Sequence, residues 1–328
     1  MIRHLVSEHV DNTNADFAIM STADNSKDYV KSYFAGTIAS ALAYLAMIGD
    51  GYVWADHFEN LGGGNPSTKR TPDFVFARPG AVDVALTESK GTRSATAKEF
   101  DKTVNDGYVG QIEPHLAYVV GSASASHGYS IGSRLTSSRK AEINIHHTDA
   151  IAATARGGPT GGSISSVQRH NYATAFRLAH SERLSREVRS GDLSNEIPFL
   201  EFEWLGRKWL TSDRVNGWYR EEIWPFMDML RPYRDERDYP CTNSAYFAVE
   251  RGCVEQVLRA LSEPGEEFSL LELAPMPLDL IQQVRSEGNS ALFPDGLAIS
   301  YNAFYAPSSP RAKLAVWLRK ERAFKVFG

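Results

Sequence analysis

The chain has few cysteines and no excess of positive charge. Only Cys241 and Cys253 occur in its 328 residues. They lie too far apart for a Cys-x-x-Cys redox or zinc pair, so we interpret them as single thiols in a reducing compartment. Lysine and arginine number 35 against 40 aspartates and glutamates, which gives a net charge of −5. This balance argues against bulk electrostatic binding of nucleic acid and leaves room for a cleft with a local basic patch.

Targeting segments, long hydrophobic runs and internal repeats are also missing. Residues 1–8 lack the apolar centre of a signal peptide. The longest apolar helix that the pattern predicts, Phe34 to Ile48, is short for a bilayer and rich in alanine and tyrosine. These features predict a cytoplasmic protein with no membrane partner. The length predicts one core with an elaboration or a second domain.

Two short apolar runs flank a proline-glycine turn signal. The first run, 74–77, follows Thr71-Pro72-Asp73, and the second ends in Glu88-Ser89-Lys90. This arrangement predicts a β-hairpin that turns at residues 78–81. In that register Asp73 lies opposite Leu86. Because side chains alternate between the two faces of a strand, Glu88 and Lys90 are expected on the same face as Asp73.

The predicted hairpin brings two carboxylates together. Asp73 and Glu88 become diagonal neighbours, and their charges repel each other unless a cation compensates them. Oxygen ligands favour a hard ion such as Mg²⁺ or Mn²⁺ over Zn²⁺. Such an ion polarises a phosphoryl oxygen and lowers the pKa of a bound water. Lys90, on the same face, is placed to orient that water or to stabilise charge on the phosphate.

These residues resemble the active-site signature of the PD-(D/E)XK nuclease superfamily, which has a restriction-endonuclease-like fold. The resemblance implies that Asp73 and Glu88 bind the metal together with the backbone carbonyl of Ser89. It implies that Lys90 is the catalytic lysine. The alternative interpretation is an ordinary hairpin with solvated charges.

Further site residues are suggested by the same resemblance. Related nucleases often take another acid from the first helix or just after it, and the candidates here are Asp50, Asp56 and Glu59. We interpret each of these three as a solvated loop charge, with a role in the site as the alternative. Some members carry a glutamine on the helix after the lysine, and Gln111 stands in about that place.

Local patterns around the signature predict an α/β (α+β) core. Residues 28–47 are helix-like and 51–56 form a strand candidate. Thr96 and Glu99 make a capping-box signature for a helix that runs towards Gln111. Residues 116–120 are apolar and are expected to form the next strand. The order helix-β-β-β-helix-β is that of the superfamily core with its mixed central sheet, and the resemblance covers about residues 28–122.

A glycine-rich segment at 156–163 lacks the ending of a phosphate-binding loop and is expected to be a connector. We therefore predict a nuclease-like core at 1–163 and a C-terminal α+β accessory region at 164–328. In the accessory region the patterns predict a basic helix at 165–189 and a hairpin at 199–211 that turns at Leu205-Gly206. They also predict a second helix at 253–261 and two strands at 291–300 and 314–318. This region could recognise DNA, bind a partner or form a shell on the core.

These observations predict a metal-dependent DNA endonuclease with Mg²⁺ or Mn²⁺ as cofactor, in restriction or another form of host defence. That biological setting rests on family analogy. The alternatives are a DNA repair or transposon-end nuclease of the same fold, and a non-catalytic module that binds nucleic acid or protein. A partner protein or a homodimer is compatible with either. Positive charge for phosphate contacts is expected from Lys69 and Arg70 before the signature, and from Arg93 and Lys98 after it.

Overall fold

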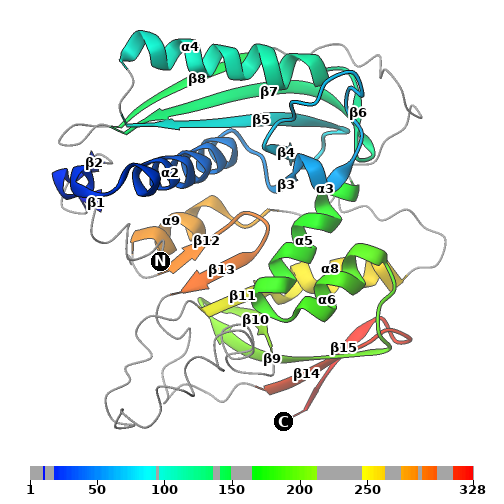
Figure 1. Cartoon of the computed structure of the whole chain (residues 1–328). Helices are drawn as coiled ribbons and strands as arrows, with labels where there is room; N and C mark the ends of the chain where they lie inside the picture. Colours follow the sequence, from blue (N-terminus) through cyan, green and yellow to red (C-terminus); the bar gives the residue numbers. More distant parts are fainter. Residues whose placement is uncertain are drawn as a thin grey trace, which may run out of the picture. The chain divides into compact units, whose positions relative to one another are not determined.

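The computed structural model describes residues 10–11, 18–93, 96–135, 141–148, 165–212, 246–262, 275–286, 290–300 and 313–327. They form a mixed α/β protein with two separate larger sheets (Figure 1). The chain divides into two compact units, residues 1–167 and 168–328. The predicted connector at 156–163 lies outside the described residues.

The first unit is built on a mixed six-stranded sheet. Its strands follow the order β3-β4-β5-β7-β6, and β8 pairs with the same edge of β7 as β6 does. Neighbouring strands are antiparallel except for β5 and β7, which are parallel. The elements are β1 (Val10–Asp11), β2 (Ala18–Ile19), η1 (Ser21–Asn25), α2 (Asp28–Gly49), β3 (Trp54–His57), α3 (Phe58–Leu61), β4 (Phe74–Ala77), β5 (Asp83–Thr92), α4 (Ala97–Gly107), η2 (Tyr108–Ile112), η3 (Glu113–His115), β6 (Val119–Val120), β7 (Ala123–Arg134) and β8 (Glu142–Thr148).

One face of this sheet is covered by α4, which carries the chain from β5 to its parallel neighbour β7 (Figure 1). The predicted capping box is confirmed, because the Thr96 side chain accepts from the Glu99 N–H and the Glu99 side chain accepts from the Thr96 N–H. Phe100 and Val104 are buried side chains of α4. A Cβ added to Gly132 of β7 would overlap both side chains. Small residues on β7 therefore let the helix pack directly on the sheet.

The opposite face is covered by α2, in which Ala43 and Met47 pack with Phe76 of β4 and Ile131 of β7 (Figure 1). This helix has 22 residues and a mean hydropathy of 1.4 over its most apolar window. By length and composition it is long and apolar enough to cross a membrane. The prediction that this helix is too short for a bilayer is therefore wrong, because it counted only the apolar part from Phe34 to Ile48, whereas the helix runs from Asp28 to Gly49.

The elements of the first unit follow the predicted order, but the strand after the second helix is misplaced. Only Val119 and Val120 form a strand within the predicted range 116–120. The long strand is β7, whose sequence Ala-Ser-Ala-Ser-His-Gly-Tyr-Ser-Ile-Gly-Ser-Arg is poor in β-branched residues. Its low β-propensity is offset by packing, since it is a central strand covered on both faces.

The second unit contains an antiparallel seven-stranded sheet with the order β12-β13-β11-β10-β9-β14-β15. One part of its core joins Trp209 of the sheet to Ile281 and Val284 of a helix. The elements are α5 (Ser165–Ala179), which begins just before the boundary, α6 (Glu182–Ser190), β9 (Glu196–Trp204), β10 (Arg207–Thr211), β11 (Tyr246–Glu250), α8 (Arg251–Ser262), α9 (Leu278–Ser286), β12 (Ser290–Leu292), β13 (Leu297–Ser300), β14 (Lys313–Leu318) and β15 (Ala323–Phe327).

Two predictions for this unit need correction. The single helix at 165–189 is in fact two, because Ser181 has an extended backbone and its hydroxyl accepts from the Leu184 N–H as the N-cap of α6. The strand at 291–300 is the hairpin β12–β13.

The other predicted elements of this unit are confirmed: the hairpin at 199–211, the helix at 253–261 and the strand at 314–318. Leu205 and Gly206 have φ angles of 53° and 68°, which suits a tight hairpin turn.

Candidate active site

The hairpin β4–β5 places Asp73 level with Glu88. Phe74 pairs with Thr87 and Val75 with Leu86, so the next pair in this register is Asp73 and Glu88. The prediction that Asp73 faces Leu86 is wrong by two residues, because Phe76 pairs with Ala85 rather than with Asp83 and the connection is two residues longer than expected. A shift of two residues leaves each side chain on its expected face. The two acids are therefore direct neighbours rather than diagonal ones.

The Asp73 carboxylate lies at the edge of β5 and is held by Ser89. Its Oδ2 accepts from the Ser89 N–H at 2.9 Å and from the Ser89 hydroxyl at 2.7 Å. The same hydroxyl lies 3.1 Å from that of Ser40 on α2. In an extended strand the N–H and C=O of one residue point to the same side. The Ser89 carbonyl, the predicted third metal ligand, therefore faces the side on which Asp73 lies.

Glu88 is a buried carboxylate, with only 2% of its surface exposed. One oxygen accepts from the Asp73 N–H at 3.2 Å and the other accepts from Lys90 Nζ. Burial raises the pKa of Glu88 from 4.5 to about 7, opposed by the Lys90 hydrogen bond and reinforced by the charge of Asp73. Burial therefore disfavours the charged form of Glu88 in the metal-free protein.

Lys90 and Gln111 complete the cluster. Lys90 Nζ donates to the Gln111 side-chain oxygen at 2.8 Å, and Gln111 Nε2 donates to the Thr71 carbonyl at 2.9 Å. A Cβ added to Gly107 would lie 3.0 Å from Lys90 Cε, which places this lysine under the end of α4. The structure thus brings together Asp73, Glu88, Ser89, Lys90 and Gln111, as predicted from the sequence.

The donor set of this cluster fits a hard divalent cation. It offers two adjacent carboxylates and a carbonyl, all oxygen ligands. A cation would also favour the charged form of Glu88, against the burial and the Asp73 charge that raise its pKa. No group of three or more histidine, cysteine, aspartate or glutamate side chains suited to a metal gathers elsewhere in the described ranges or here. The pair Asp73 and Glu88 would therefore need backbone oxygen and water to complete the coordination.

The three further acids lie in different surroundings. Glu59 is exposed on α3, and within the described residues no hydrogen bond joins it to the cluster. Asp50 caps the end of α2 and accepts from the Tyr129 hydroxyl at 2.7 Å. Asp56 is 6% exposed on β3 and accepts from Asn60 at 2.9 Å, so its interpretation as a solvated loop charge is wrong. It lies within β3, which ends at His57, one residue beyond the predicted strand.

The four predicted phosphate-binding side chains are not equivalent. Arg70 is exposed, and its Nη1 would lie 3.3 Å from a Cβ added to Gly110, next to Gln111. Lys69 is exposed beside it. Arg93 instead donates to the Ala23 carbonyl at 2.9 Å.

Lys98 is exposed in the first turn of α4. At roughly 1.5 Å per residue it lies about 13 Å along the helix from the end that contacts Lys90. Arg70 and Lys69 are therefore the basic side chains that belong to the site.

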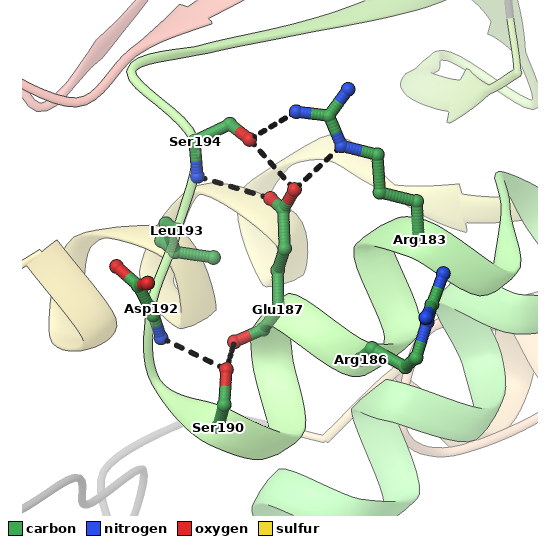
Figure 2. Close-up of a pocket in the computed structure, with 7 residues that line it drawn as sticks. All are labelled: Arg183, Arg186, Glu187, Ser190, Asp192, Leu193 and Ser194. Carbon is green, nitrogen blue, oxygen red and sulfur yellow. Dashed lines mark hydrogen bonds and ion pairs between the residues drawn. The ribbon is translucent and has the colours of Figure 1, made fainter.

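A pocket in the second unit coincides with part of the predicted basic helix (Figure 2). Glu187 accepts from Arg183 at 2.8 Å, from the Ser194 hydroxyl at 2.6 Å and from the Ser194 N–H at 3.0 Å. Burial raises the pKa of Glu187, but these hydrogen bonds outweigh burial and lower it overall. These hydrogen bonds tie α6 to Ser194, which precedes β9.

His115 was given no role from the sequence, yet it is fully buried beside the candidate site. It follows Gln111 by four residues, a spacing that places both side chains on one side of a helical turn. That spacing is the signal that could have drawn attention to it.

Comparisons of the whole chain with protein-family models, curated proteins and solved structures find no match.

Proposed function

We propose that the chain is a metal-dependent nuclease that hydrolyses DNA phosphodiester bonds, with its active site at Asp73, Glu88 and Lys90. The observation that carries the proposal is the buried Glu88 carboxylate, 2% exposed, beside Asp73 and in contact with Lys90. The order α2-β3-β4-β5-α4-β7 and the parallel pair β5–β7 support a restriction-endonuclease-like core. An endonuclease of restriction or host defence is the biological setting we propose.

The residues have separate roles in this proposal. Mg²⁺ or Mn²⁺ held by Asp73, Glu88 and the Ser89 carbonyl would supply Lewis-acid polarisation and a water of lowered pKa. Lys90 stabilises negative charge that develops on the phosphate. Gln111 orients Lys90 by accepting from its ammonium group at 2.8 Å. Arg70, exposed beside Gly110, contacts a phosphate of the same strand.

A second function is favoured by one specific observation. Glu88 accepts from the Asp73 N–H and from Lys90, which also donates to Gln111. The Asp73 carboxylate accepts from Ser89. A polar network of this kind can also serve only to fix the packing of a sheet. The alternative is therefore a non-catalytic module that keeps the fold for binding nucleic acid or protein.

Nicking of supercoiled plasmid separates these functions. We expect the full chain to nick plasmid with Mg²⁺ and to stop when EDTA is added. Lys90→Ala should reduce the rate roughly a hundredfold. Lys98→Ala, an exposed lysine at the far end of α4, is the matched control and should keep full activity. Plasmid binding without any nicking would favour the binding module.

A further inference from the structure

The segment that leads to Asp73 has no strand of its own. Residues 70–73 precede β4, and Pro72 has no N–H to donate. Three of its carbonyl groups nevertheless accept hydrogen bonds. The Arg70 carbonyl accepts from His115 Nε2 at 2.8 Å and the Thr71 carbonyl from Gln111 Nε2 at 2.9 Å. The Asp73 carbonyl accepts from the Phe58 N–H at 3.2 Å. The position of Asp73 therefore depends on groups outside the hairpin.

His115 can satisfy both of its hydrogen bonds in only one form. Its Nδ1 accepts from the Asn65 N–H at 3.0 Å, so Nδ1 carries a lone pair. The ring proton must then be on Nε2, where it donates to the Arg70 carbonyl. The ring is 1% exposed and lies edge-on to Phe58, with 4.9 Å between ring centroids. The same imidazole thus ties Asn65 to Arg70 and supports the residue that holds the Asp73 carbonyl.

The loop is shaped to fit this imidazole. Gly64 has a φ of +77°, and a Cβ added to it would lie 2.6 Å from both His115 Nδ1 and Phe58 Cζ. Asn65 Nδ2 also donates to the Pro114 carbonyl at 3.0 Å. Any side chain at Gly64 would therefore displace the ring, and the loop is joined to η3 by more than one bond.

We propose that His115 is a positioning residue for the candidate active site. It holds residues 65–70 against η3, and through them it sets the Asp73 carboxylate and the Arg70 guanidinium in place. Its role in catalysis rests on the proposed nuclease function. His115 itself does not contact the cluster of Asp73, Glu88 and Lys90 through any hydrogen bond found in the described residues.

A graded set of variants of the full chain tests this role. Gln at position 115 can still donate to Arg70, whereas Asn can only accept from Asn65 and Ala can do neither. We expect Mg²⁺-dependent nicking to fall in the order wild type, His115→Gln, His115→Asn, His115→Ala. The alanine variant should lose roughly a hundredfold in kcat, as small misplacements of a site do. His127→Ala, a partly buried histidine that pairs with Asp83, is the control and should retain activity.

Two measurements do not need nuclease activity. Imidazole nitrogen NMR of the wild-type chain should show His115 as the neutral tautomer with its proton on Nε2. Hydrogen exchange should show the Asn65 amide protected in the wild type and exposed in His115→Ala, with the amides of β5 and β7 unchanged.

The outcomes separate this inference from the proposed function. A wild-type chain that never nicks DNA would overturn the nuclease, while exchange at Asn65 would still decide whether His115 holds the loop. An equal loss of activity in the Gln, Asn and Ala variants would overturn the positioning role, because it would show that only ring packing matters. A proton found on Nδ1, or an Asn65 amide that exchanges freely in the wild type, would also overturn it.

Discussion

Replacing Glu88 by glutamine should stabilise the metal-free protein at about pH 8 and leave its stability nearly unchanged at about pH 4. Burial raises the pKa of this carboxyl from 4.5 to about 7. Its proton is therefore bound more tightly in the folded chain than in the unfolded one. The stability that Glu88 contributes is highest below pH 4.5, falls as the pH rises through the two pKa values, and stays low above about 7.

The size of the effect follows from the same shift. A rise in pKa from 4.5 to about 7 corresponds to about 3 kcal/mol of unfolding free energy. Glutamine resembles the protonated acid, so Glu88→Gln should recover most of this at about pH 8. Added Mg²⁺ should reverse the order, because a cation bound by the charged carboxylate stabilises the wild type alone.

Urea unfolding in EDTA, with hydrogen exchange of the β5 amides as the readout, measures this difference in unfolding free energy in the first unit. Glu59→Gln, on the exposed surface of α3, is the matched control and should not change stability at either pH. A Glu88→Gln variant that is less stable than the wild type at about pH 8 would refute the reasoning. It would show that the ion pair with Lys90 outweighs the cost of burial.

Three further changes test other parts of the structure. Arg70→Ala should weaken DNA binding about equally on all sequences and reduce the salt slope by about one, whereas Arg93→Ala should leave the slope unchanged; fluorescence anisotropy at several salt concentrations measures both. Gly132→Ala should destabilise the first unit by about 1–3 kcal/mol, because its Cβ meets Phe100 and Val104; thermal unfolding should show no change if the helix can shift freely. Glu187→Gln should destabilise the second unit by about 1–2 kcal/mol at neutral pH. Because the pKa of Glu187 is lowered in the fold, this difference should disappear as the pH falls below 4.5 in urea titrations.

Local patterns were sufficient where they agreed with packing. The Pro79-Gly80 turn signal predicted the hairpin, and the parity of its residues placed Glu88 and Lys90 on the face of Asp73. The Thr96 capping box predicted the start of α4. Gln111 was expected near the lysine from the family resemblance, and it accepts a hydrogen bond from it.

The features that were missed depend on contacts distant in sequence. The strand β7 is made of small residues because α4 and η2 pack closely on it. The local sequence pattern of the strand does not show that these elements cover it. Asp56 is buried because β3 lies beside β4. Arg93 is tied to Ala23, which precedes it by 70 residues, so its position after the signature did not reveal its partner.

The most direct test of the metal site is a crystal structure of the full chain soaked with Mn²⁺. The account predicts an anomalous peak between the carboxylates of Asp73 and Glu88, with Lys90 Nζ turned away from Glu88 and still held by Gln111. A structure with no peak there, in which Lys90 keeps its contact with Glu88 at saturating Mn²⁺, would contradict it.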